Sequence, residues 1–158
     1  MKKLLLLLLF IPLVSFGQTY KDVMSISSVD MFKKVAIENG YEFDSADEDG
    51  WITYGFNMTR DSIEGNKSSQ WLHYNTKNDK FSLNFSRTST TFFGKENIDD
   101  SQYDLILKEV KEKCSYYNIS NSGGTDFVTY SCSDSSYKGK IGFVIKEGQG
   151  IIRHFPPE

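Results

Sequence analysis

The sequence predicts an α+β fold in which two tandem α-β-β-β repeats form one antiparallel sheet of about six to eight strands, with two helices on one face. Three observations lead to this prediction. Two segments have the apolar spacing of an amphipathic helix, three segments of strand character follow each of them, and this order occurs twice. The repeats cover about residues 28–86 and 101–155.

The two helices are predicted over residues 28–39 and 101–114. Gly40 supplies a C-terminal stop for the first helix, and Ser101 with Asp104 supplies a capping box for the second. In both segments, apolar residues recur at spacings of three and four. These residues are Val29, Phe32, Val35 and Ala36 in the first segment, and Tyr103, Ile106, Leu107, Val110 and Cys114 in the second.

The six strands are predicted over segments rich in aromatic and β-branched residues. An offset of 75 lays Tyr41 over Tyr116, and one inserted residue then aligns residues 51–54 with 127–130. Residues 41–45 and 116–120 add two strands if they also pair. The predicted strands are residues 51–58, 70–75 and 80–86 in the first repeat, and 127–133, 140–146 and 150–155 in the second.

The first 17 residues have the pattern of a cleaved signal peptide. A basic pair precedes an apolar run over residues 4–14, and Ser15 and Gly17 place small side chains just before Gln18. This run is shorter than the roughly 20 residues that a membrane-spanning helix needs. An uncleaved N-terminal anchor is the alternative interpretation.

Export of residues 18–158 as a single periplasmic or secreted domain follows from this prediction, with no transmembrane span after cleavage. Cleavage removes Lys2 and Lys3 but no acidic residue, so the net charge changes from −3 to −5. An acidic chain of this kind is a poor partner for a polyanion, so nucleic-acid binding is not expected.

Cys114 and Cys132 are the two cysteines of the chain, and an exported protein places them where thiols are usually oxidised. We therefore predict a disulfide between them. Because side chains alternate along a strand, a Cys132 that points toward the helices takes Val128 and Tyr130 with it. Phe127 then faces outward, together with Thr129 and Ser131.

The repeat predicts the same assignment of side chains to the two sheet faces in the first half of the chain. Trp51 and Thr53 are expected on the sheet face that no predicted helix covers. The expected core residues are Ile52, Tyr54 and Phe56 under the first helix, and Phe81, Leu83, Phe85, Ile141, Phe143 and Ile145 in the hairpins.

No catalytic, cofactor or metal motif is recognised. Residues 44–50 match a calcium loop incompletely, because Ser45 and Phe56 stand at ligand positions, and an acidic turn is the preferred interpretation. His73 and His154 lie in different predicted hairpins, where they can approach each other across a sheet or serve only in packing.

Trp51, Trp71, Phe127 and Arg153 are the candidate binding residues, as an aromatic and cationic patch on the uncovered face. The alternative is that these aromatic residues serve strand packing alone.

The function predicted from these features is an exported, non-catalytic module that binds an unknown protein or envelope partner. Tandem helix-plus-sheet repeats of this outline are similar to secreted β-lactamase inhibitory proteins, which grip an enzyme with a broad sheet. This likeness implies that an exported enzyme is one partner to consider, with the chain as its inhibitor. The alternatives are a carrier of a small apolar or aromatic ligand and, third, a small hydrolase with no recognisable motif.

Overall fold

A computed structural model describes residues 18–157, apart from 87–88, 93–94 and 99–101, and gives only the backbone for 89–92 and 95–98. The predicted signal peptide and Ser101 of the predicted capping box lie outside the described residues. In the part described, three helices and one large antiparallel sheet confirm the α+β fold.

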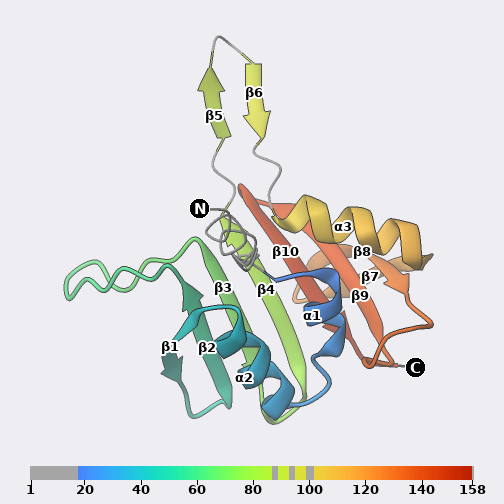
Figure 1. Ribbon diagram of the computed structural model, residues 1–158, viewed down its shortest axis with the longest axis horizontal. Coiled ribbons are helices and arrows are strands. Elements are labelled where there is room, and N and C mark those ends of the chain that lie inside the picture. The colour runs from blue at the N-terminus through green and yellow to red at the C-terminus, as the bar shows by residue number, and fades with distance from the viewer. Residues whose placement is uncertain (1–17, 87–88, 93–94, 99–101, 158) are drawn as a thin grey trace, which may run out of the picture.

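The large sheet contains eight strands in the order β1-β2-β3-β4-β10-β9-β8-β7, and every neighbouring pair is antiparallel (Figure 1). Each repeat contributes four consecutive strands, and the two halves meet where β4 pairs with β10. The strands are β1 (Tyr41–Ala46), β2 (Trp51–Phe56), β3 (Gln70–Asn75), β4 (Lys80–Ser86), β7 (Ser115–Ser122), β8 (Thr125–Ser131), β9 (Lys140–Lys146) and β10 (Gln149–Phe155).

A second, two-stranded sheet was not predicted from the sequence. It consists of β5 (Ser89–Phe92) and β6 (Lys95–Ile98), which lie between β4 and the helix of the second repeat.

Both predicted helices are present, as α2 (Val29–Glu38) and α3 (Gln102–Lys113). The Ser28 hydroxyl accepts a hydrogen bond from the backbone of Met31 and so caps α2. Gly40 follows the end of α2 with a φ of +76°, a left-handed conformation that glycine adopts without strain.

A third helix, α1 (Tyr20–Ser25), was missed because its six residues are too few to show helical periodicity. Its one sequence signal is the capping box between Thr19 and Asp22, which the structure forms.

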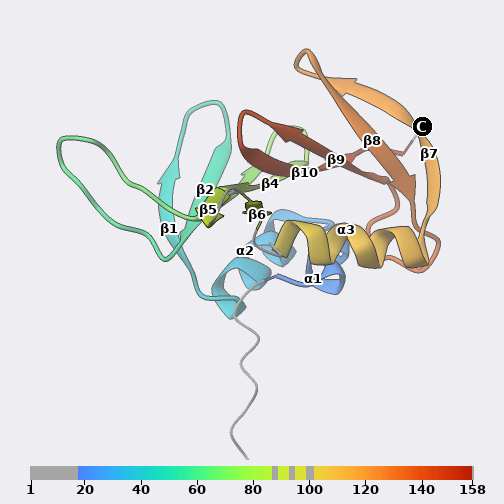
Figure 2. The same ribbon diagram turned by 90° about the horizontal axis from the view of Figure 1, so that it is seen from above.

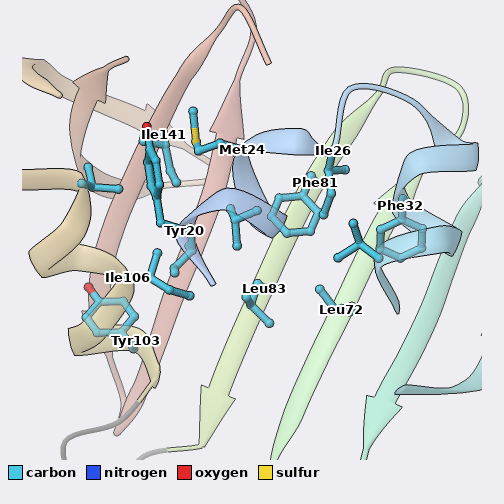
Figure 3. Packing of buried hydrophobic residues seen from close by; sticks show 14 of the residues in the cluster. Tyr20, Met24, Ile26, Phe32, Leu72, Phe81, Leu83, Tyr103, Ile106 and Ile141 are labelled. Carbon is cyan, nitrogen blue, oxygen red and sulfur yellow. The ribbon is translucent and has the colours of Figure 1, made fainter. Parts of the chain in front are cut away.

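All three helices cover the same face of the sheet (Figure 2). Phe32 of α2 packs its ring 5.7 Å from Tyr54, 5.2 Å from Tyr74 and 6.4 Å from Phe81. The core continues beneath α1 and α3 (Figure 3), where Ile106 is buried. One hydrophobic core thus joins the two repeats.

The predicted core residues of the hairpins are buried, with one exception. Phe81, Leu83 and Ile141 are fully buried. Ile145, in contrast, is 54% exposed, and its assignment to the core was wrong. It stands one residue before the end of β9, where the strand runs toward the tight turn into β10.

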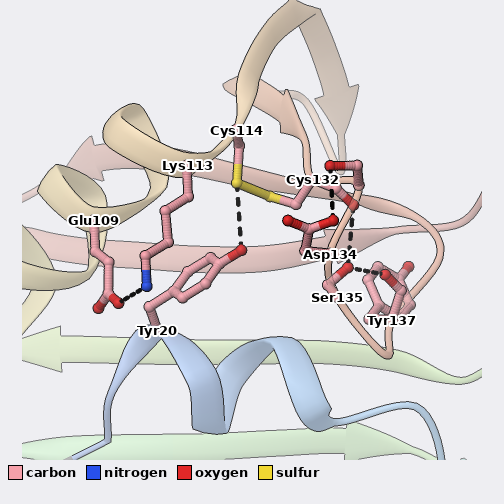
Figure 4. Close-up of a disulfide and its surroundings, with 9 residues drawn as sticks. Tyr20, Glu109, Lys113, Cys114, Cys132, Asp134, Ser135 and Tyr137 are labelled. Carbon is pink, nitrogen blue, oxygen red and sulfur yellow. Dashed lines mark hydrogen bonds and ion pairs between the residues drawn. A yellow bond between two sulfur atoms is a disulfide. The ribbon is translucent and has the colours of Figure 1, made fainter.

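The predicted disulfide between Cys114 and Cys132 is present (Figure 4). It joins the residue after α3 to the residue after β8, and the Tyr20 hydroxyl of α1 lies 3.5 Å from the Cys114 sulfur. Tyr130 and Cys132 belong to the core, which confirms the predicted orientation of β8.

The pairing of the strands corrects the overlay of the two repeats. Phe43 lies opposite Tyr54 in the first half, and Tyr116 lies opposite Tyr130 in the second. Phe43, rather than Tyr41, is therefore the structural counterpart of Tyr116, and the single offset of 75 was wrong in this strand. The overlay compared residue types along the chain and did not include cross-strand pairing, which sets the register of a half-buried strand.

Candidate functional site

The sheet face opposite the helices is named the open face here. In the described part of the chain, no helix lies on it (Figure 2). The strand register places one row of residues straight across it, from Thr53 in β2 through His73, Ser82, Arg153 and Gly142 to Thr129 in β8.

An open cavity of about 400 Å³ lies at the first-repeat end of the open face. Thr53 of β2 and Trp71 and His73 of β3 form its floor, because residues of alternate positions on paired strands share a face. Asp44 from β1 and Asn66 from the β2–β3 connection form its rim.

A β-bulge in β1 directs Asp44 into this cavity. Phe43 pairs with Tyr54 and Ser45 pairs with Thr53, so Asp44 has no partner in the ladder. An extra residue of this kind turns two successive side chains toward one face. The carboxylate of Asp44 then accepts hydrogen bonds from the Asn66 amide nitrogen at 2.6 Å and the Ser45 hydroxyl at 2.8 Å.

The β2–β3 connection folds back on itself and so carries Asn66 to the rim. Thr59 and Lys67 form an antiparallel bridge, with backbone N–H···O distances of 2.8 and 2.9 Å. Gly65, at φ +80°, adopts the left-handed conformation just before Asn66. The rim is therefore formed by two different segments, β1 and the β2–β3 connection.

Trp71 and His73 form the aromatic part of the floor. Their rings are stacked at an interplanar angle of 24° with centroids 6.5 Å apart. Gly55 lies opposite Trp71 in the neighbouring strand, and a Cβ atom there would lie 3.0 Å from the Trp71 ring. The missing side chain therefore leaves room for the indole against β2.

His73 is held neutral at physiological pH. Burial lowers its pKa; Asp44 acts in the opposite direction, and the charge of Arg153 lowers it further. The Nδ1 atom of His73 lies 3.1 Å from the Thr53 hydroxyl, within hydrogen-bond distance. The floor of the cavity thus offers polar atoms but no net charge of its own.

Arg153 lies toward the second-repeat end of the open face and is tied to that end. Its guanidinium carbon lies 5.1 Å from the centre of the Phe127 ring, and its Nη1 donates to the Ser122 hydroxyl at 2.9 Å. Burial lowers the pKa of Arg153.

The four candidate patch residues all lie on the open face, but they are not equivalent. Trp71 lines the cavity, whereas Trp51 lies at the opposite end of β2, across from Asn75. Phe127 is only 1% exposed, because Phe155 packs 5.4 Å from its ring and Arg153 lies over it. Phe127 supports Arg153 and offers little contact surface itself.

The two histidines do not meet. His154 follows Arg153 in β10, so its side chain points to the helix side. Its ring stacks on Tyr137 with centroids 3.9 Å apart, and the Phe81 ring lies 4.7 Å away in a tilted arrangement. Burial lowers the pKa of His154 to about 3. His73 and His154 therefore share no cleft.

Sequence reasoning missed Asp44 and Asn66 as members of the cavity. The acidic run after Asp44 suggested only a turn, which Asp47 and Gly50 do form. Asn66 has no local signal, because its position depends on the bridge between Thr59 and Lys67.

Among the described residues, no group of three or more His, Cys, Asp or Glu side chains is arranged to hold a metal ion. No described helix has the length and hydropathy needed to cross a membrane. No protein-family model, curated protein or solved structure matches the chain.

Proposed function

We propose that the chain is an exported, non-catalytic module that binds another macromolecule through the open face. The observation that carries the proposal is the cavity over Trp71 and His73, on a face that no described helix covers. Tryptophan and arginine, which this face presents as partly buried side chains, are among the residue types that most often anchor interfaces. Asp44 and Trp71 are also held in place within the chain itself, which lowers the entropic cost of binding.

Export is the part of the proposal that the disulfide supports, because such bonds persist mainly outside the cytoplasm. Intact-mass analysis of the protein from its own host tests this point. We expect a chain that begins at Gln18 and contains the Cys114–Cys132 bond. A chain that retains residues 1–17, or that has two free thiols, would contradict export with cleavage.

Site-specific photo-crosslinking in that host tests the binding surface. A photoreactive phenylalanine analogue replaces Trp71 in one variant and Lys33, on the exposed side of α2, in a matched control. We expect a discrete adduct from position 71 and none from position 33. The purified partner should then bind the unmodified chain at least about tenfold more tightly than an Asn84→Arg variant.

Asn84 suits this test because it lies opposite Trp71 in β4, at the middle of the open face. An arginine side chain at position 84 would cover part of the open face, and the substitution removes no core side chain. Equal adducts at positions 71 and 33 would contradict the proposal. So would a partner that binds the Asn84→Arg variant as tightly as the unmodified chain.

A carrier of a small apolar ligand is the second candidate, and a groove of about 280 Å³ favours it. Leu107 of α3, Val128 of β8 and Phe143 and Ile145 of β9 line this groove. Native mass spectrometry of host-derived protein should then detect a retained small molecule, lost in a Val128→Trp variant. A hydrolase ranks third, because His73 and His154 lie on opposite faces of the sheet.

A further inference from the structure

We infer that the cavity on the open face binds one ring of a neutral carbohydrate, as part of a longer glycan. This inference rests on the proposed function and names the ligand class of the same site. It is carried by the aromatic floor of Trp71 and His73 together with the polar rim of Asp44 and Asn66.

The floor matches the apolar side of a sugar ring. A pyranose presents a face of C–H groups, and such groups make weak but favourable contacts with the electron-rich face of an aromatic ring. Trp71 and His73 are two residues apart in β3, and their rings are stacked with an interplanar angle of 24°. This aromatic floor can therefore pack against the C–H face of a pyranose.

The rim matches the polar edge of a sugar. Each sugar hydroxyl both donates and accepts hydrogen bonds, so it is best bound by an acceptor beside a donor. The carboxylate of Asp44 accepts one bond from Asn66 and one from Ser45, which leaves further acceptor capacity on both oxygens. The Asn66 amide adds a carbonyl oxygen and a second N–H, and Thr53 adds a hydroxyl at the floor.

The charges favour a neutral ligand. The carboxylate of Asp44 disfavours an anion such as a phosphate, and no Lys or Arg of the described residues lines the cavity. The pKa of His73 is lowered, so it adds no positive charge at neutral pH. The nearby cation of Arg153, which also bears on His73, disfavours a cationic peptide side chain.

The size is also suitable. A cavity of about 400 Å³ falls within the range of small-ligand sites. Because the cavity is open to solvent, a bound ring can be part of a longer chain.

Fluorescence titration tests the inference on residues 18–158. The chain has two tryptophans, so a Trp51→Phe variant leaves Trp71 as the sole reporter. The probes are cellohexaose, chitohexaose, mannohexaose and maltohexaose. Each is added up to about 10 mM, so that millimolar dissociation constants can be measured. We expect at least one probe to shift the Trp71 emission, and no probe to shift the emission of a Trp71→Phe variant, in which only Trp51 reports.

Calorimetry with the best probe measures the contribution of each group. We expect Trp71→Ala and Asp44→Ala to raise the dissociation constant by at least about tenfold. The matched control Trp51→Ala, on the same face but outside the cavity, should leave it within about twofold. Circular dichroism and the melting temperature establish that each variant is folded.

Two results would overturn the inference: no probe shifts the Trp71 emission, or Trp71→Ala binds the best probe as tightly as the unmodified chain. The crosslinking experiment separates this failure from failure of the proposed function. If position 71 captures a protein whose binding the Asn84→Arg variant loses, while no saccharide binds, the open face binds protein and only the carbohydrate inference fails. If neither a saccharide nor a face-dependent partner is found, both fail.

Discussion

Individual side chains in neighbouring positions of this sheet have opposite environments. Arg153 and His154 are consecutive in β10, yet the first lies on the open face and the second is 3% exposed beneath the helices. The Nε2 atom of His154 has no hydrogen-bond partner among the described residues. A histidine in that position is stable only when neutral.

The burial of His154 makes stability depend on pH. Its folded pKa of about 3 lies below the unfolded value, so the unfolded chain binds the proton first and stability is lost as the pH falls below about 6.5. We expect the free energy of unfolding to drop by about 2 kcal/mol between pH 7 and pH 5 from this group alone. Urea unfolding at both pH values measures the drop.

A His154→Gln variant should lose this part of the pH dependence, whereas His73→Gln should keep it. His73 contributes in the same direction, because burial also lowers its pKa. The chain has only these two histidines, so few other groups titrate in this range. An unchanged pH dependence in His154→Gln would refute the role assigned to the buried imidazole.

Gly142 gives a second prediction at the scale of one residue. A Cβ atom there would lie 2.5 Å from Cε2 of Phe155 and 3.0 Å from Cβ of Phe127. We expect Gly142→Ala to destabilise the protein by about 1–3 kcal/mol through overpacking. Urea unfolding measures the cost, with the exposed Ser131→Ala as a control that should change little. Equal stability of the two variants would contradict this packing.

At the scale of elements, a cap stabilises the start of α2, and a disulfide links α3 to the sheet. Ser28 caps α2, and the disulfide joins the end of α3 to the end of β8. The disulfide was predicted from the sequence, because it depends on only two residues of well-defined chemistry.

Removal of the disulfide should cost about 3 kcal/mol, because the bond closes a loop of 18 residues and restricts the unfolded chain. The comparison is urea unfolding of the oxidised protein against the double variant Cys114→Ser, Cys132→Ser. The unmodified protein in reducing agent is the control and should match the double variant. A difference below about 1 kcal/mol would show that the bond contributes little.

Loss of the α2 cap should have a smaller effect. We expect Ser28→Ala to cost about 1 kcal/mol, since the Met31 N–H loses its acceptor, and Ser28→Asp to restore most of it. Thermal unfolding compares the two variants. An aspartate variant no more stable than the alanine variant would argue against capping as the cause.

At the scale of the whole molecule, the two repeats form one continuous structure. Residues 82–86 of β4 pair with residues 149–153 of β10, and a single core runs beneath all three helices. A sheet shared in this way favours unfolding as one unit.

We therefore expect both halves to unfold together. Both tryptophans lie in the first repeat, so their fluorescence reports that half, while hydrogen exchange of β8 and β9 reports the second. The two probes should give the same urea midpoint. Exchange protection in β8 and β9 that persists after the fluorescence transition would instead indicate independent repeats.

The sequence by itself determined the fold class, two helices, six strands and the disulfide. Helical spacing, strand composition and cysteine number are local properties, so they can be read without knowing what packs against what. The assignment of Tyr130 and Cys132 to the core also came from the sequence, through the alternation of side chains along a strand.

Only the tertiary structure decided the cavity. Asp44 enters it through a bulge, Asn66 through a folded connection, and the Trp71 indole lies against Gly55 in another strand. The tertiary structure also decided the exposure of Phe127. This residue lies on the open face, but Phe155 and Arg153 cover it. These positions depend on contacts between residues far apart in the chain, and no local pattern of residues records such contacts.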